Sequence, residues 1–205
     1  PKKVLQPQVA QASERLYSAL KVEPQDWVQV NAFRPEEGVI KDGTYMSKTS
    51  KFEITLPNGE WQFDQQMIHP QIRVRLVPTN PLRTNDIVVA VELRDYPECE
   101  SPQDLDAAVE IDCSERWPGY KKLRGGSQRV ADSAMEDGKR PGFLLDFITL
   151  TPQKKTFRVI DYALYCRWFK RTYSVIVIGD KERYPQYEKD VEKIKQSFHV
   201  LDKNN

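Results

Sequence analysis

The sequence lacks the short motifs that mark common catalytic, metal and phosphate sites. Its two histidines, His69 and His199, lie far apart, and no C-x-x-C or H-x-x-x-H spacing occurs, so we predict no metal site. Neither a Gly-rich phosphate loop nor a G-x-S-x-G nucleophile turn occurs. We therefore expect no catalytic residues and no cofactor, and predict that the protein is not an enzyme. A hydrolase that joins a histidine to a serine or cysteine in a cleft is one alternative.

Long hydrophobic runs and an excess of either charge are also missing. The longest aliphatic run, Ile87–Val91, is far shorter than the about 20 residues that a membrane-spanning helix needs. The chain has 31 Lys and Arg against 30 Asp and Glu, so its formal net charge is +1. That balance gives no general attraction for nucleic acid or anionic lipid. With 205 residues, the chain is long enough for one sizeable globular core.

Cysteine is scarce, and the chain does not begin with methionine. The three cysteines, Cys99, Cys113 and Cys166, are an odd number, so they cannot all pair within the chain. Cys113 falls on an expected helix and Cys166 in an apolar strand, which favours buried thiols over one disulfide with one free thiol. The chain opens at Pro1, so we expect a missing N-terminus, through which a peripheral membrane tether is conceivable. The compartment therefore stays open at this point.

The first fifty residues differ in pattern from the rest. Pro7–Lys21 carries apolar residues at roughly helical spacing, which predicts one short helix. Prolines and glycines then interrupt the pattern, so residues 22–50 are expected to be irregular. We interpret 1–50 as an N-terminal extension and 51–205 as the main domain.

From Lys51 onward the pattern is mainly that of strands. Phe52–Leu56 alternates apolar and polar residues, and the following Asn58-Gly59 predicts a hairpin to a returning strand at Trp61. Ile72–Leu76 alternates with two arginines and should have one wet face, whereas Ile87–Leu93 is apolar on both faces and should be central.

The second half of the domain predicts two helices around an antiparallel meander. Ser101-Pro102 has the features of a helix start, and a polar, glycine-rich stretch over 124–142 predicts a loop or hairpin tip. Three strands follow, over 142–150, 156–169 and 172–178, before a closing helix that starts near Pro185. This order predicts an α+β fold in which an antiparallel β-sheet is sandwiched by helices.

Three stretches within about residues 51–201 resemble the PsbP-like superfamily. They match its opening hairpin, its strand followed by a Ser-Pro-capped helix, and its last strand with a closing helix that ends in I-x-x-S-F-x-V. The stretches are Phe52–Pro57 with Trp61, Asp86–Tyr96 with Ser101-Pro102, and Tyr173–Val177 with Ile194–Val200. The resemblance implies the α-β-α, PsbP-like fold. That group includes photosystem II PsbP proteins, DcrB-like bacterial envelope proteins and a eukaryotic Ran-binding factor, so its functions diverge.

One pair of charges stands out on the long strand of the meander. Asp161 and Arg167 share the face of Tyr165, opposite the strongly apolar face of the same strand. Two charges among apolar neighbours line a ligand pocket or an interface in one interpretation, and are satisfied by neighbouring strands in the other. We take Asp161, Tyr165 and Arg167 as the candidate binding residues.

Two further charged sets are weaker candidates. The carboxylates on the 101–119 helix are expected to form a solvated face, with Arg116 neutralising Asp112. A basic set with flanking aromatics would suit nucleic acid, but compensating acids disfavour that interpretation. The first set is Asp104, Asp106, Glu110, Asp112 and Glu115; the second is Lys121, Lys122, Arg124, Arg129, Lys170 and Arg171 with Tyr120, Trp168 and Tyr173.

These observations favour a non-enzymatic protein-interaction or scaffold protein of PsbP/DcrB type. We expect it to be bacterial and exported, either periplasmic or a membrane-anchored envelope lipoprotein, although the cytoplasm remains an alternative. Its partner would be another protein, bound through the sheet edge, the 124–142 stretch or the N-terminal extension. The alternative function is a small-molecule carrier or chaperone with a pocket near Asp161 and Arg167.

Overall fold

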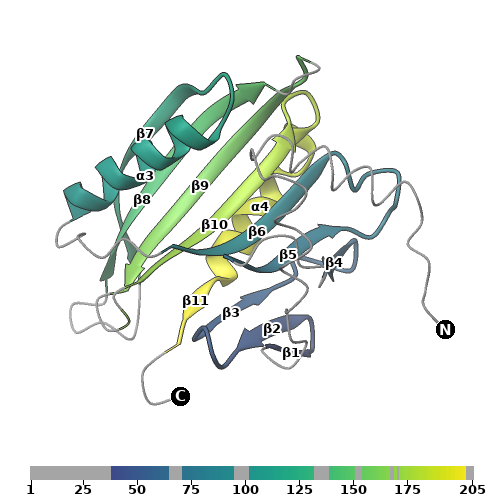
Figure 1. Ribbon diagram of the computed structural model, residues 1–205. Helices are drawn as coiled ribbons and strands as arrows, with labels where there is room; N and C mark the ends of the chain where they lie inside the picture. Colours follow the sequence, from purple (N-terminus) through teal and green to yellow (C-terminus); the bar gives the residue numbers. More distant parts are fainter. Residues whose placement is uncertain are drawn as a thin grey trace, which may run out of the picture.

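The computed structural model describes most of the chain after residue 37. The described residues are 38–64, 71–94, 102–131, 139–150, 154–166, 169 and 171–201. Two antiparallel sheets and two α-helices make up this part of the protein (Figure 1).

The larger sheet has seven strands, each antiparallel to its neighbours. Its order is β4-β5-β6-β10-β9-β8-β7, so β4 and β7 are the end strands. From one edge to the other, the strands are β4 (Trp61–Asp64), β5 (Ile72–Pro78), β6 (Ile87–Arg94), β10 (Arg171–Asp180), β9 (Thr156–Cys166), β8 (Lys139–Leu150) and β7 (Lys121–Ala131).

The smaller sheet joins the two ends of the described chain. Its four strands are ordered β1-β2-β3-β11: β1 (Gly38–Lys41), β2 (Thr44–Ser47), β3 (Phe52–Thr55) and β11 (His199–Val200). Phe52 lies at its centre, where it contacts the rings of Tyr45, Tyr173 and Phe198. Because Tyr173 belongs to β10, this aromatic cluster fastens the small sheet to the large one.

The two helices lie on opposite faces of the large sheet. In Figure 1, α3 (Pro102–Arg116) crosses in front of the sheet and α4 (Glu188–Ser197) lies behind it, after a short 3-10 turn (Tyr184–Gln186). Leu105, Val109 and Cys113 of α3 pack on one apolar cluster, whereas Val191 and Ile194 of α4 pack on a second cluster together with the small sheet. Central strands are apolar on both faces because both faces are covered.

Most of the predicted elements are confirmed. The helix after Ser101-Pro102, its buried stripe, the central strand at Ile87 and the meander all lie where the sequence places them. Cys113 and Cys166 are buried free thiols, as predicted, while Cys99 lies outside the described residues.

The predicted hairpin at Asn58-Gly59 is wrong, because the strands on either side of it belong to different sheets. Gly59 does not have the positive φ that a tight two-residue hairpin turn requires. The Asn58 side chain instead accepts a hydrogen bond from the Glu60 backbone N–H (2.8 Å) and donates one to Asp190 of α4 (3.1 Å). Trp61 also donates its indole N–H to Asp190 (3.0 Å), so contacts with α4 carry the chain from one sheet to the other.

The irregular segment predicted for 22–50 is wrong where the structure describes it. Residues 38–47 form the β1–β2 hairpin, which turns at Asp42 (φ 50°) and Gly43 (φ 74°). Asp-Gly is a frequent sequence for a turn with two positive φ angles, so this signal was present. The predicted helix at Pro7–Lys21 lies outside the described residues, and the division of the chain at residue 50 stays a prediction.

Two smaller expectations also need correction. The 124–142 stretch is not simply a loop, since 124–131 and 139–142 are arms of the long β7–β8 hairpin, whose tip lies outside the described residues. The face of β5 that carries Arg73 and Arg75 is not wet: Arg75 is buried and forms an ion pair with Asp64 on β4, and Arg73 is half-buried.

Candidate functional site

Asp161, the first predicted binding residue, lies in a buried charge cluster beneath α3. Its side chain is 1% exposed, and its Oδ2 atom lies 2.7 Å from Nη1 of Arg94. Arg94 belongs to β6, and β10 separates β6 from β9. The register places Thr172 of β10 opposite Arg94, and Ile176 opposite Asp161, so all of these side chains project from the same face of the sheet.

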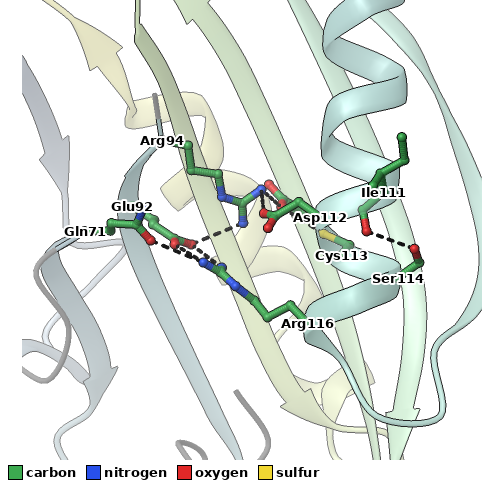
Figure 2. Close-up of polar contacts among 9 residues, drawn as sticks. Gln71, Glu92, Arg94, Ile111, Asp112, Cys113, Ser114 and Arg116 are labelled. Carbon is green, nitrogen blue, oxygen red and sulfur yellow. Dashed lines mark hydrogen bonds and ion pairs between the residues drawn. The ribbon is translucent and has the colours of Figure 1, made fainter. Parts of the chain in front are cut away.

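Glu92 and Arg116 extend this cluster toward the C-terminal end of α3. Arg94 contacts Glu92 on its own strand (Nη2–Oε2, 3.1 Å) and Asp112 on α3 (Nη1–Oδ2, 3.5 Å). Arg116 holds the same Glu92 carboxylate with two hydrogen bonds of 2.7 and 3.0 Å, and reaches Gln71 at 3.3 Å (Figure 2). The helix and the sheet are therefore joined by two guanidinium groups and three carboxylates.

The acidity of Glu92 follows from its two arginine neighbours. Burial alone would raise the pKa of this carboxyl, but the charges of Arg94 and Arg116 and their hydrogen bonds outweigh burial and lower the pKa from 4.5 to about 2. Burial also opposes the charge of Arg116, yet contact with Glu92 raises the pKa of Arg116 above its ordinary value. Both partners consequently stay ionised at neutral pH.

Cys113 lies beside this cluster and is held in its thiol form. Its Sγ atom donates a hydrogen bond to Oδ2 of Asp161 over 3.5 Å. Burial, together with the negative charge of Asp161, raises the pKa of Cys113 well above its ordinary range. Since the thiolate is the nucleophile of cysteine chemistry, this thiol is poorly suited to covalent catalysis.

The centre of the cluster is paired internally and exposes little to solvent. Glu92, Arg94 and Asp161 are each at most 2% exposed. Beside them on β10, the hydroxyls of Thr172 and Ser174, like Oδ1 of Asp161, are buried without a hydrogen-bond partner among the described residues. Charges buried in this way fix how the helix sits on the sheet, because each is costly to leave without its counter-charge.

The predicted binding residues are therefore only partly brought together. Tyr165 is half-buried and packs on the α3 side of the sheet, on the same face as Asp161, while Arg167 lies outside the described residues. The partner of Asp161 is Arg94, which the sequence did not single out. Glu92 and Arg94 were nevertheless visible as charges at the end of the apolar run that begins at Ile87. The direct ion pair of Arg116 is with Glu92, and that of Asp112 is with Arg94; the expected attraction between Arg116 and Asp112 is present as a smaller contribution to the raised pKa of Arg116.

A contrasting set of charges lies along β7, the end strand beside β8. Residues 121–127 are all exposed, and no described strand pairs with the outer edge of β7. The strand sequence KKLRGGSQRVA contains four basic residues and no acidic one. Lys122 pairs with Glu110 of α3, and Ser127 bonds to Asp106, so α3 flanks one face of this edge.

The other face of β7 borders a groove of about 470 Å³. Strand β7, Leu144 of β8 and helix α4 line it; the lining residues are Arg124, Gly125, Gly126, Ser127, Leu144, Glu192 and Lys195. Beneath it, the buried carboxylate of Asp146 accepts hydrogen bonds from Arg124 (2.9 Å) and from two atoms of Arg158 (2.8 and 3.0 Å). This groove was not predicted from the sequence, because its walls come from segments far apart in the chain.

Other features of the described residues add no second site. No group of three His, Cys, Asp or Glu side chains is placed to hold a metal in that part of the chain. His199 is exposed on β11, and His69 lies outside the described residues. Neither α3 nor α4, the helices described, combines the length and apolar character that crossing a bilayer requires.

No family model and no curated protein matches this chain. Solved structures match it in fold. Cyanobacterial PsbP (CyanoP) from Synechocystis sp. PCC 6803 has a TM-score of 0.53 and 15% identity, covering 77% of this chain and 91% of that one. LpqN of Mycobacterium tuberculosis, described as involved in cell envelope biogenesis, has a TM-score of 0.52 and 12% identity. The match covers 75% of this chain and 86% of LpqN. The Saccharomyces cerevisiae Ran-binding protein Mog1p has a TM-score of 0.51 and 10% identity, and the match covers 81% of this chain and 98% of Mog1p.

The fold is PsbP-like. The predicted resemblance in fold to PsbP is thereby confirmed over about three quarters of the chain. The fold class is α+β, as predicted, with two antiparallel sheets in place of the expected single one. At these low identities the likeness concerns architecture alone.

Proposed function

We propose that this protein is a non-enzymatic interaction or scaffold protein of PsbP/DcrB type, which binds another protein through the exposed edge formed by β7. The observation that carries the proposal is an end strand of eleven residues whose exposed positions 121–127 lie beside a groove. An unpaired strand edge is a ready template for pairing with another chain. The α-β-α layering implied by the resemblance belongs to this proposal, supported by α3 and α4 packing on opposite faces.

The buried cluster beneath α3 supports the same proposal by contrast. Its carboxylates are held by arginines, and its thiol is kept protonated by burial. These groups are suited to stabilising the fold rather than to receiving a substrate. We infer that binding takes place at the surface and that the cluster stabilises the fold that presents this surface.

Export is part of the proposal and draws on two structural neighbours. CyanoP and the cell-envelope protein LpqN have the same fold at TM-scores above 0.5. We propose a bacterial envelope or periplasmic location, with a lipid anchor or signal segment upstream of Pro1. Sequencing the start of the natural reading frame tests this directly: an export signal or lipid-attachment cysteine is expected there.

The interaction is tested by capture from the native source with two matched variants. Leu123 on β7 and Leu82 in the loop after β5 are both exposed leucines, so Leu123→Arg and Leu82→Arg change the same side chain in the same way. The wild type and Leu82→Arg should recover the same defined partner, and Leu123→Arg should lose it. Equal recovery by both variants would exclude β7 as the binding edge.

A small-molecule carrier remains a second candidate because of the groove. Its volume of about 470 Å³ lies within the range of about 300–1,000 Å³ typical of ligand pockets. This groove lies between β7 and α4, on the sheet face opposite to Asp161. Native mass spectrometry of protein purified without denaturation should show a bound small molecule if the carrier function holds, and the bare chain mass if it does not.

A further inference from the structure

We propose that β7 takes up an extended segment of a partner protein as an added strand, and that this segment carries an acidic residue two positions away from a bulky apolar one. The inference rests on the proposed function and deepens it, since it names the chemistry of the partner.

Only part of β7 is suited to receive another strand. The pairing with β8 shifts register between Lys122 and Arg124, which leaves Leu123 in a bulge. Lysines and bulges are the usual devices that discourage edge-to-edge pairing, and both occur at 121–123. Beyond the bulge, residues 124–127 pair with β8 in regular register and include Gly125, Gly126 and Ser127. The added strand would therefore pair with 124–127, and its end would reach the exposed Leu123 at the bulge.

Arg124 supplies the charge that would recognise an acidic residue. Its side chain is 64% exposed, and its Nε atom is bound to Asp146. Its two terminal amino groups have no partner among the described residues, so they can donate to a carboxylate. The residues that line the groove include two cations, Arg124 and Lys195, against one anion, Glu192.

Gly126 supplies the space for the apolar residue. It lies two positions from Arg124, so both face the groove, and its register partner on β8 is Leu144. A Cβ atom placed on Gly126 would meet nothing within 4 Å, whereas one on Gly125 would approach Lys122, Leu145 and Phe143. A large apolar side chain on the neighbouring strand can fold over such a glycine and cover the groove floor.

The charges of β7 favour a different protein over a second copy of this chain. Pairing of β7 with itself would place Lys121, Lys122, Arg124 and Arg129 near one another across the ladder, and like charges in such positions are destabilising. With an acidic segment as the added strand, this repulsion is replaced by attraction between opposite charges. Arg124 and Gly126 then determine the order of its residues on the groove face.

The test uses the full chain and a short synthetic peptide of alternating β-forming residues with the core Glu-Thr-Leu. Titration of the ¹⁵N-labelled protein should shift the backbone amides of 124–127 most. A Lys-Thr-Leu peptide should bind about tenfold more weakly, the loss expected for one charge-assisted contact. Raising the salt concentration should reduce this difference.

Strand addition itself is tested by methylating the peptide backbone. N-methyl groups on alternate amides block one edge of an extended peptide and leave the other edge intact. One of the two methylation patterns should abolish binding, and the other should leave it within about twofold, since only one edge pairs with β7. Equal behaviour of both patterns would overturn the strand-addition model.

Two matched pairs of variants test the residue assignments. Arg124→Glu should remove the preference for the acidic peptide, whereas Arg183→Glu, which changes another exposed arginine that has one ion pair, should not. Gly126→Leu should remove the preference of the protein for a peptide with Leu over a peptide with Thr at the position two residues after the Glu. Gly59→Leu is its control, because a Cβ on Gly59 also meets nothing within 4 Å.

The outcomes separate this inference from the proposed function. If no peptide binds but Leu123→Arg still abolishes partner capture, the edge binds a protein by another chemistry and the inference is wrong. If the peptide fails and capture is insensitive to Leu123→Arg, both fail. A concentration-dependent dimer that Arg124→Glu strengthens would show that a second copy is the occupant, which also overturns the inference.

Discussion

The cluster beneath α3 and the edge at β7 use similar residues in opposite ways. At the cluster, Arg94 and Arg116 are matched to Glu92 and Asp161, and all of these except the partly exposed Arg116 are buried. At the edge, Arg124 shares one buried carboxylate with Arg158 and keeps most of its side chain in solvent. Charge that is buried and matched stabilises one arrangement of helix and sheet, whereas charge that is exposed and in excess can be used for binding.

The largest effect that separates the two regions should come from Arg94→Met. This change leaves Glu92 and Asp161 buried with fewer counter-charges, and breaking a buried pair in this way costs about 3–5 kcal/mol of unfolding free energy. Arg124→Met at the exposed edge should cost less than about 1 kcal/mol. Urea unfolding followed by tryptophan fluorescence measures both. Similar losses for the two variants would mean that the cluster does not stabilise the fold as described.

The cluster and the edge also differ in how far the sequence predicts them. Asp161 was found from the sequence because a charge on an otherwise apolar strand is conspicuous. Its partner Arg94 was not, because β6 and β9 are far apart in the sequence and come close only where β10 lies between them in the sheet. The groove was missed for the same reason: packing brings Arg124, Leu144 and Lys195 together, and no short spacing in the sequence links them.

For the fold, local signals succeeded where one element was concerned. The Ser-Pro start signal and the apolar stripe of Leu105 and Val109 each concern a single helix, and they predict α3 correctly. The Asn58-Gly59 turn failed because pairing depends on what else competes for the strands. There, hydrogen bonds from Asn58 and Trp61 to Asp190 of α4 decide the path of the chain.

Glu92 should make the free energy of unfolding depend more steeply on pH below 4.5. Burial opposes its charge, but Arg94 and Arg116 lower its folded-state pKa from 4.5 to about 2, so below pH 4.5 the unfolded chain takes up a proton that the folded chain does not. This contribution is complete above pH 4.5 and is lost as the pH falls toward 2. Glu92→Gln should flatten the curve by up to about 1.4 kcal/mol per pH unit in that window. Parallel curves for the wild type and Glu92→Gln would contradict the ion pairing.

Thiol reactivity should distinguish the interior from the edge directly. In a Cys99→Ser background, Cys113 and Cys166 are both buried, and burial raises the pKa of Cys113. A third cysteine placed by Leu123→Cys is exposed on β7. It should react with iodoacetamide at neutral pH at least about tenfold faster than the two buried thiols, because reaction needs an accessible thiolate. Peptide mapping by mass spectrometry gives the three rates, and an equally fast Cys113 would show that α3 opens readily.

The smallest effect is expected for the hydroxyls beside the cluster. Thr172 and Ser174 are fully buried on β10, and their oxygen atoms have no hydrogen-bond partner among the described residues. Removing a buried polar atom that makes no hydrogen bond relieves its desolvation cost, so Thr172→Val should be neutral or stabilise by up to about 1 kcal/mol. Thermal unfolding at neutral pH measures it, with Thr149→Val as the control, since the Thr149 hydroxyl donates to the Pro118 carbonyl at 2.6 Å. Thr149→Val should destabilise. If Thr172→Val destabilises as much, the Thr172 hydroxyl has a partner such as a buried water, and the cluster is larger than its side chains alone.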